Sequence, residues 1–263
     1  MSWSTHVAPM LLTIVLWWGS TALIARLVGR APRTYGRLLL LTTICGLVGL
    51  ALVVGLRDVT TGASAMTALV AALAIWGWIE VTFLTGKVTG PEPVLHGAAV
   101  ARRLGSGLLR RAVDAITAIL WHELLIAGTV ALVALLLVGS ANDLALLVLL
   151  LLWLMRSSAK LNLFLGVRNL GGAFLPPHLQ HLLEFMRQRP MNPLLPVSVA
   201  LGVAIAWQCG SAALAADAPH AAAAYSILAT LALLAVLEHL LMVLPVPAEA
   251  LWRWSLANRR AAP

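Results

Sequence analysis

Seven side chains of chemically active types lie within otherwise apolar stretches of this sequence. They are Glu80, His122, Glu123, Arg156, Lys160, Glu238 and His239. Carboxylates and imidazoles bind metals or carry protons, and a nearby ammonium or guanidinium neutralises a carboxylate. An ionisable side chain near the centre of a membrane helix costs roughly 2.5–3.5 kcal/mol on insertion scales. We therefore expect these side chains to have partners inside the fold.

The same residues are predicted to lie at one depth. Each is about five to ten residues from the same end of its apolar stretch, so a helical rise of 1.5 Å per residue places them in a layer about 7 Å thick. Four stretches contribute to this layer, and Trp76, Trp78 and Trp121 flank it. The coincidence predicts one shared polar cluster.

Three kinds of site fit this composition. The first is a buried ion-pair, hydrogen-bond or proton-handling network, in which Arg156, Lys160 and Asn162 satisfy the carboxylates and imidazoles. The second is a metal site, such as a di-metal iron centre, because carboxylates and imidazoles from several helices form such centres. Its ligands would be Glu80, His122, Glu123, Glu238 and His239. The Glu-x-x-His spacing of those centres is absent, since the pairs here are adjacent.

The third kind of site binds a tetrapyrrole. His122 or His239 would then be an axial ligand to the magnesium of bacteriochlorophyll or to a haem iron, because neutral imidazole is a common metal ligand. The residues alone leave all three alternatives open.

The elements that position these residues follow from composition. Hydrophobic residues make up 61% of the 263 and charged residues 11%, against roughly 45–50% and 25% in soluble domains. The apolar blocks are about 20 residues long, the length that spans a bilayer. This excludes a soluble enzyme, a disordered chain and a nucleic-acid binder, despite the net charge of +8. We predict an all-α polytopic membrane protein, a single domain over residues 1–263. Its spans are predicted at 7–28, 37–56, 63–85, 113–139, 143–165, 196–216 and 221–244.

Lysine and arginine placement predicts the orientation. Fifteen of the 18 basic residues fall on one side of the predicted spans, Arg57 alone falls on the other, and Arg156 and Lys160 lie within a span. The positive-inside rule then places the N-terminus in the periplasm and the C-terminus in the cytoplasm.

Two long loops, 86–112 and 166–195, are predicted to be cytoplasmic. Ala99–Asp114 is either an interfacial helix on the inner leaflet or a solvated basic loop. In the second loop, Pro176-Pro177 predicts a helical stretch over His178–Gln188. His178, His181 and Glu184 share one face of it, which suits a partner-facing surface and, less well, a metal.

Several long strings carry a family resemblance. They are Leu73–Pro91, Trp121–Leu124, Ser158–Asn169, Met191–Val199, Leu237–Pro247 and Leu251–Trp254. Together they resemble the PuhE family, which is assigned to photosynthetic complex assembly in purple phototrophic bacteria. The resemblance runs from the Trp17-Trp18 pair to Trp254 and covers nearly the whole chain.

The resemblance implies a multi-pass protein of the bacterial cytoplasmic (inner or intracytoplasmic) membrane. It implies a role in reaction-centre or light-harvesting assembly, with bacteriochlorophyll as a candidate cofactor. Partners would be membrane lipids, reaction-centre or light-harvesting subunits and other assembly factors, with Ala99–Asp114 and Pro176–Arg189 as docking surfaces. The alternative is a membrane metalloenzyme acting on a tetrapyrrole or quinone-like substrate, with Lys160 as proton donor and Arg156 as charge anchor. The family supplies no established role for these residues.

Overall fold

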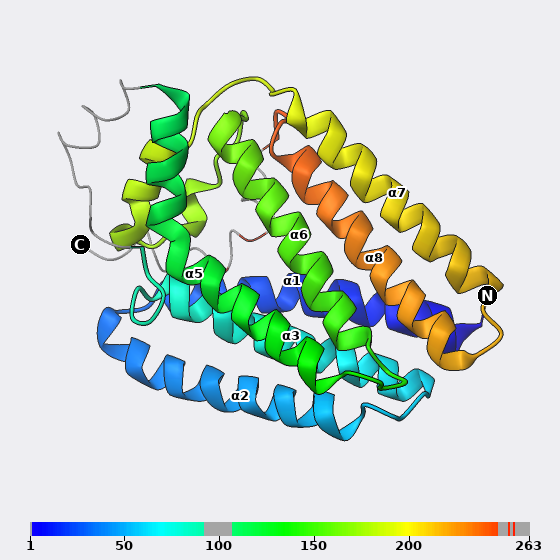
Figure 1. Ribbon diagram of the computed structural model, residues 1–263. Coiled ribbons are helices and arrows are strands. Elements are labelled where there is room, and N and C mark those ends of the chain that lie inside the picture. The colour runs from blue at the N-terminus through cyan, green and yellow to red at the C-terminus, as the bar shows by residue number, and fades with distance from the viewer. Residues whose placement is uncertain (1, 92–106, 247–251, 253–254, 256–263) are drawn as a thin grey trace.

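The computed structural model describes residues 2–91, 107–246, 252 and 255, and these residues are helical apart from turns and short connections (Figure 1). Seven helices are long and apolar enough to cross a membrane. They are α1 (Ala8–Val28), α2 (Tyr35–Gly55), α3 (Gly62–Leu84), α5 (Leu108–Leu136), α6 (Leu144–Leu165), α7 (Leu194–Ala215) and α8 (Pro219–Leu241). The prediction of an all-α, seven-span membrane protein is therefore confirmed.

Successive helices run in opposite directions, so the bundle has two distinct ends. We call one the basic end, defined by the loops 29–34 and 166–193 and by the last turns of α1, α3, α6 and α8. The other is the opposite end. There the N-terminal turn η1 (Trp3–Val7) contacts α7, where His6 Nε2 lies 3.1 Å from the Ala213 carbonyl oxygen.

Two helices form the centre of the bundle. α3 and α8 have the largest buried shares of the spans, and both contact α1 and α6. α2 packs along α3 and α7 along α8 as the outer partners of two helical hairpins (Figure 1). Small residues permit the closest approaches, since a Cβ atom at Gly49 would lie 2.7 Å from the Ala71 carbonyl oxygen of α3.

Helix α5 differs from the predicted fourth span. It begins at Leu108 rather than at residue 113 and ends at Leu136 rather than at residue 139. Arg110 and Arg111 therefore belong to the helix and not to the loop in which the sequence prediction placed them. The proposed interfacial helix at 99–114 lies outside the described residues up to position 106, and its last residues form the first turns of α5.

The segment after α6 folds back onto the basic end. It contains two 3₁₀ helices, η3 (Gly172–Phe174) and η4 (Pro177–Phe185), and η4 lies where a helical stretch was expected over 178–188. Leu179, Leu182 and Phe185 of η4 are buried in a cluster with Phe83 of α3. The backbone NH of Val167 donates to the Arg187 carbonyl at 3.1 Å, in the only β-bridge found among the described residues. These residues, 166–193, therefore cover the basic end, and we call them the roof segment.

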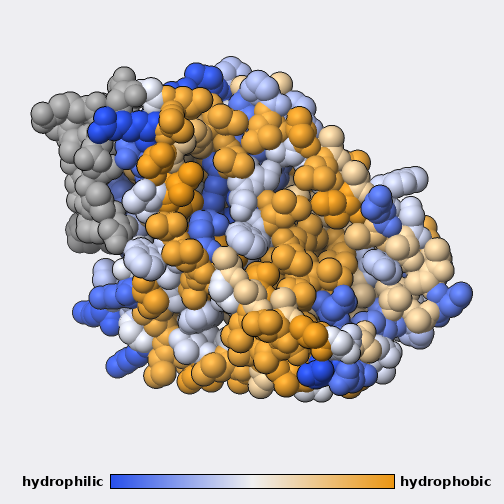
Figure 2. Space-filling view, viewed as in Figure 1, coloured by the Kyte–Doolittle hydropathy of each residue, from blue (hydrophilic) through white to orange (hydrophobic). Residues whose placement is uncertain are grey.

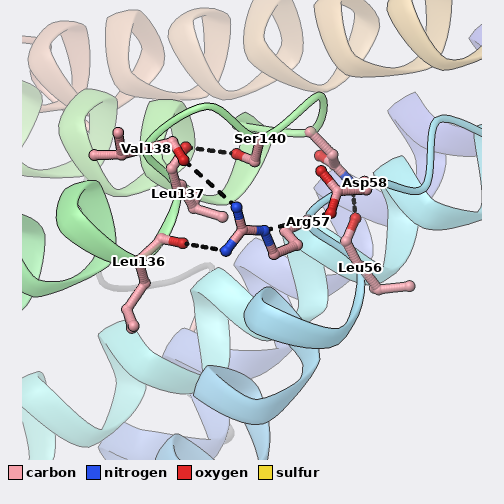
Figure 3. A network of polar contacts seen from close by, with 8 residues as sticks. Leu56, Arg57, Asp58, Leu136, Leu137, Val138 and Ser140 are labelled. Atoms are coloured by element: carbon pink, nitrogen blue, oxygen red, sulfur yellow. Dashed lines mark hydrogen bonds and ion pairs between the residues drawn. The ribbon is translucent and has the colours of Figure 1, made fainter.

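At the opposite end, Arg57 connects two helix ends. Its Nη1 donates to the Leu136 carbonyl at 3.4 Å and its Nη2 to the Val138 carbonyl at 3.5 Å, while Nε lies 3.4 Å from Asp58 (Figure 3). A cation is favourable at the carboxyl end of a helix because the backbone carbonyls there carry partial negative charge. Arg57 therefore holds the end of α2 against the end of α5.

Candidate functional site: a polar belt beside an intramembrane cavity

The predicted layer of ionisable residues is present as a set of pairs between helices. We call it the polar belt; it consists of Glu80 on α3, His122 and Glu123 on α5, Arg156, Ser158, Lys160 and Asn162 on α6, Ser198 on α7, and Glu238 and His239 on α8. Its members face two directions because neighbouring positions on a helix point about 100° apart.

The first ion pair joins α3 to α6. Nη2 of Arg156 donates to Oε2 of Glu80 at 3.2 Å. The Glu80 side chain is only 8% exposed, whereas that of Arg156 is 46% exposed and lines a cavity. The other carboxylate oxygen of Glu80, Oε1, is buried and has no hydrogen-bond partner among the described residues.

The second ion pair joins α5 to α6. The Lys160 ammonium donates to Oε1 of Glu123, and the Trp153 indole donates to Oε2 at 3.0 Å. Both charged side chains are about one quarter exposed, with values of 25% and 26%. Glu123 thus has both oxygens engaged, in contrast to Glu80.

The third group forms a chain of hydrogen bonds across α8, α6 and α7. His239 Nε2 lies 2.9 Å from the Ser158 hydroxyl, and its Nδ1 lies 2.8 Å from the Ala235 carbonyl. Asn162 donates to the Ser158 carbonyl and to the Ser198 hydroxyl, both at 3.0 Å. This chain holds three helices together on the side of α6 that faces away from Glu80.

The cavity beside the belt has a volume of about 780 Å³, within the range of about 300–1,000 Å³ typical of small-molecule sites. Its apolar floor in mid-bundle includes Leu73, Trp76 and Leu231. Trp252 also lines it and packs edge-on against Trp17, with 5.6 Å between ring centroids. Glu80, Arg156, Lys160 and Glu238 are the ionisable side chains at the level of the belt that line it. Figure 2 shows hydrophilic side chains in a furrow between the apolar flanks of α5 and α6.

The structure does not bring the five predicted metal ligands to one point. Within the described residues, no three His, Cys, Asp or Glu side chains are close enough to hold one ion. Glu238 faces the cavity while its neighbour His239 faces α6, and Glu123 is bound to Lys160. His178, His181 and Glu184 on η4 likewise do not form a group that could hold a metal ion.

The two predicted tetrapyrrole ligands lie away from the cavity. Both ring nitrogens of His239 are engaged, as described above. His122 is 1% exposed and stacks on Phe83 with 4.4 Å between ring centroids, and its Nδ1 has no hydrogen-bond partner in the described part of the chain. Neither histidine lines the cavity.

Sequence reasoning missed several residues of the site. Trp153, Ser158 and Ser198 complete the partners of Glu123, His239 and Asn162. Arg111, assigned to a loop, is 4% exposed and donates to the Phe185 carbonyl at 3.0 Å, with its guanidinium 4.8 Å from the Phe164 ring centre. The available signal was the i, i+4 spacing of Ser158 and Asn162, which places both on one helix face.

Fold and site together define a multi-pass helical membrane protein with paired charges beside an intramembrane cavity. The chain belongs to the family described as "Protein of unknown function (DUF3623)", which matches residues 3–262. A relative in Rhodobacter capsulatus, "Uncharacterized 30.4 kDa protein in puhA 5'region", is 35% identical over 257 residues, which cover 94% of this chain and 90% of the relative. No solved structure gives a significant match. The more specific family name, PuhE, stays a prediction from the sequence strings.

Proposed function

We propose that this protein is an integral-membrane assembly factor for the photosynthetic reaction centre or light-harvesting complex. The observation that carries the proposal is the full-length relative in the puhA 5' region of a purple bacterium. The gene region supports a photosynthetic role, and the seven apolar spans support a membrane location. The cytoplasmic membrane, inner or intracytoplasmic, is the location that this role requires.

The roof segment offers a surface for partner subunits. One side of η4 is buried against the bundle through Leu179, Leu182 and Phe185. Gln180 and Glu184 on the other side of η4, and Arg189 four residues after its end, are exposed and polar. We propose this face of Pro176–Arg189 as a docking surface for a subunit during maturation, because the exposed ridge is polar while its base is anchored.

Handling of bacteriochlorophyll is the finer part of the proposal, and it comes from the family resemblance. A pigment held by this chain would not take its axial ligand from His239, since both of its nitrogens are bound within the protein. The absorption spectrum of the purified protein tests this part: Soret and Qy bands support it, and a colourless protein from pigmented cells contradicts it.

The assembly role is tested by purification from a phototrophic host. Tagged protein solubilised in mild detergent is expected to retain reaction-centre or light-harvesting subunits. A variant with Glu184 and Arg189 both changed to Ala is expected to retain them several-fold less while folding normally. Consistent absence of any photosynthetic subunit from the wild-type preparation would reject the assembly role.

A further inference from the structure

One wall of the cavity carries a carboxylate oxygen without a hydrogen-bond partner among the described residues, and beside it a guanidinium with further N–H groups to donate. Oε1 of Glu80 is a buried acceptor with no partner among the described residues. Arg156 has five N–H donors, and within the described residues it donates a hydrogen bond to Glu80 alone. Both residues line the cavity. A molecule bound here would find an acceptor and a donor side by side.

The charge of this wall restricts the ligand further. Glu238 also lines the cavity and interacts electrostatically with Arg156, so the wall holds two carboxylates and one guanidinium. Lys160 also lines the cavity, but its charge is matched by Glu123. Arg168, beyond the end of α6, lines it too and lies outside this group of three. With Glu80, Glu238 and Arg156 all ionised, the group of three carries a formal charge of −1. An anionic ligand would add negative charge in a medium of low dielectric constant, whereas a positively charged donor would neutralise it.

The shape of the cavity favours an amphipathic ligand. Along α3 the lining runs from Leu84 to Leu73, about 16 Å at 1.5 Å per residue, from the basic end to the apolar floor. The cavity is also bordered by Ala115 and Ile119 of α5 and by Leu163 and Phe164 of α6. α5 and α6 diverge toward the basic end in Figure 1, and the furrow between them is visible in Figure 2. This furrow gives apolar chains a route to the surrounding bilayer.

We propose that the cavity is a binding site for a phospholipid with a primary ammonium head group, that is, of the phosphatidylethanolamine class. The ammonium donates to Glu80 and Glu238, and the phosphate accepts from Arg156. The acyl chains lie on the apolar floor and pass between α5 and α6. A tetrapyrrole fits this wall less well, because no histidine lines the cavity within the described residues and ring carbonyls would leave Oε1 of Glu80 unsatisfied. The lipid site and the assembly role rest on different observations, so either can fail alone.

The test is native mass spectrometry of the full-length protein in a non-ionic detergent. Three lipids with identical acyl chains are offered singly: phosphatidylethanolamine, phosphatidylcholine and phosphatidylglycerol. Phosphatidylcholine has no N–H donor, and phosphatidylglycerol is anionic. We expect phosphatidylethanolamine to be retained at least five-fold more than either of the others.

Three variants test whether the preference for phosphatidylethanolamine arises in the cavity. Glu80→Gln is expected to reduce the retention of phosphatidylethanolamine to the level of phosphatidylcholine. Asp58→Asn is the control: it removes a carboxylate that is exposed at the opposite end of the bundle and does not line the cavity, so it should keep the preference. Gly77→Leu fills the cavity without using charge; a Cβ there would meet only Ile24, at 3.7 Å, and lipid retention should be lost.

Equal retention of the three lipids by the wild type would overturn the proposal. So would a preference for phosphatidylcholine, which would assign recognition to the tryptophans, or for phosphatidylglycerol, which would make Arg156 an anion site. A preference that survives both Glu80→Gln and Gly77→Leu would also overturn it, because the lipid would then bind elsewhere. If Glu80→Gln does not fold, the Gly77→Leu result decides.

Discussion

At the scale of single residues, the two ion pairs of the polar belt differ in how completely their carboxylates are hydrogen-bonded. Both oxygens of Glu123 are bound, one by Lys160 and one by Trp153, so this carboxylate is a structural link between α5 and α6. Glu80 binds Arg156 through one oxygen and leaves the other directed to no described residue. A buried polar atom without a partner is costly and is retained where it serves a purpose.

Replacement of Glu123 tests its structural role. Glu123→Gln removes the negative charge opposite Lys160, so we expect the protein to lose about 1.5–3 kcal/mol of stability, the typical contribution of a hydrogen bond to a charged group. Thermal unfolding of the detergent-solubilised protein measures the loss. The control is Asp58→Asn, because the Arg57–Asp58 pair is exposed and exposed pairs contribute about 0–1 kcal/mol. Equal effects of the two substitutions would contradict the assignment.

We expect His178 to make the roof segment sensitive to acid. Partial burial lowers the pKa of His178 below its usual 6.5, and neighbouring His181 adds to this, although a hydrogen bond to the Leu84 backbone opposes it. The unfolded segment therefore binds the proton more readily than the folded one. The stabilising contribution is complete above about pH 6.5 and is lost as the pH falls through the lowered pKa of the folded state.

Hydrogen exchange checks the effect on η4. We expect residues 177–185 to exchange faster at pH 5.5 than at pH 7.5, after correction for the intrinsic rates. His178→Gln should remove this difference, whereas His220→Gln, at the opposite end of the bundle, should preserve it. Equal protection at the two pH values in the wild type would show that His178 does not control the segment.

At the scale of the elements, α5 depends on a few anchors at the basic end. Arg111 is buried there and connects α5 to η4 through the Phe185 carbonyl and to α6 through the Phe164 ring. The cavity lies between α5 and α6 at this level, so the anchor also fixes one wall of the cavity.

Loss of this anchor should loosen the first turns of α5. We expect Arg111→Gln to destabilise the protein by about 2 kcal/mol, from the lost charged hydrogen bond and cation–π contact. Hydrogen exchange of Leu108–Ala118 should rise as well. The neighbouring Arg110 is exposed, so Arg110→Gln is the matched control and should change neither quantity. A similar response of the two variants would mean that general positive charge, not the contact, holds α5.

The α2–α3 hairpin depends on close approach at a glycine. A methyl group at Gly49 would lie 2.7 Å from a backbone oxygen of α3 and 3.2 Å from Ile75. Gly49→Ala should therefore destabilise the protein by about 1–3 kcal/mol, as overpacking does. Gly128→Ala meets nothing within 4 Å and should be neutral or stabilise α5 by about 0.5–1 kcal/mol. Thermal unfolding compares the two; a stabilised Gly49→Ala variant would show that the hairpin can spread without loss.

At the scale of the whole molecule, the sequence was sufficient for the helices and for the depth of the polar belt. Length and apolarity determine a membrane span almost alone, and residue counting places Glu80 and Arg156 at one level. The direction in which each of these side chains faces could not be predicted from the sequence. Whether Glu238 or His239 faces the cavity depends on the rotation of α8, which its packing against α3 and α7 decides. The start of α5 was missed because Arg110-Arg111 resembles a loop boundary, while the contacts of Arg111 come from segments 50 or more residues away.

The orientation of the molecule in the membrane is the remaining prediction, and it determines which leaflet the cavity serves. The positive-inside rule places the basic end in the cytoplasm, and Arg57 at the opposite end is held by the carboxyl end of α5 and by Asp58 (Figure 3). Single cysteines at Ala141 (opposite end) and Glu184 (basic end), both exposed, report the two sides once Cys45 and Cys209 are changed to Ala.

A membrane-impermeant maleimide should label Ala141→Cys in spheroplasts with an intact membrane, and Glu184→Cys only after permeabilisation. Labelling of both after permeabilisation controls for accessibility. The reverse pattern would place the basic end in the periplasm. The cavity, which lies in that half of the bundle, would then draw its ligand from the outer leaflet, and a docking surface on η4 could meet only periplasmic parts of a partner.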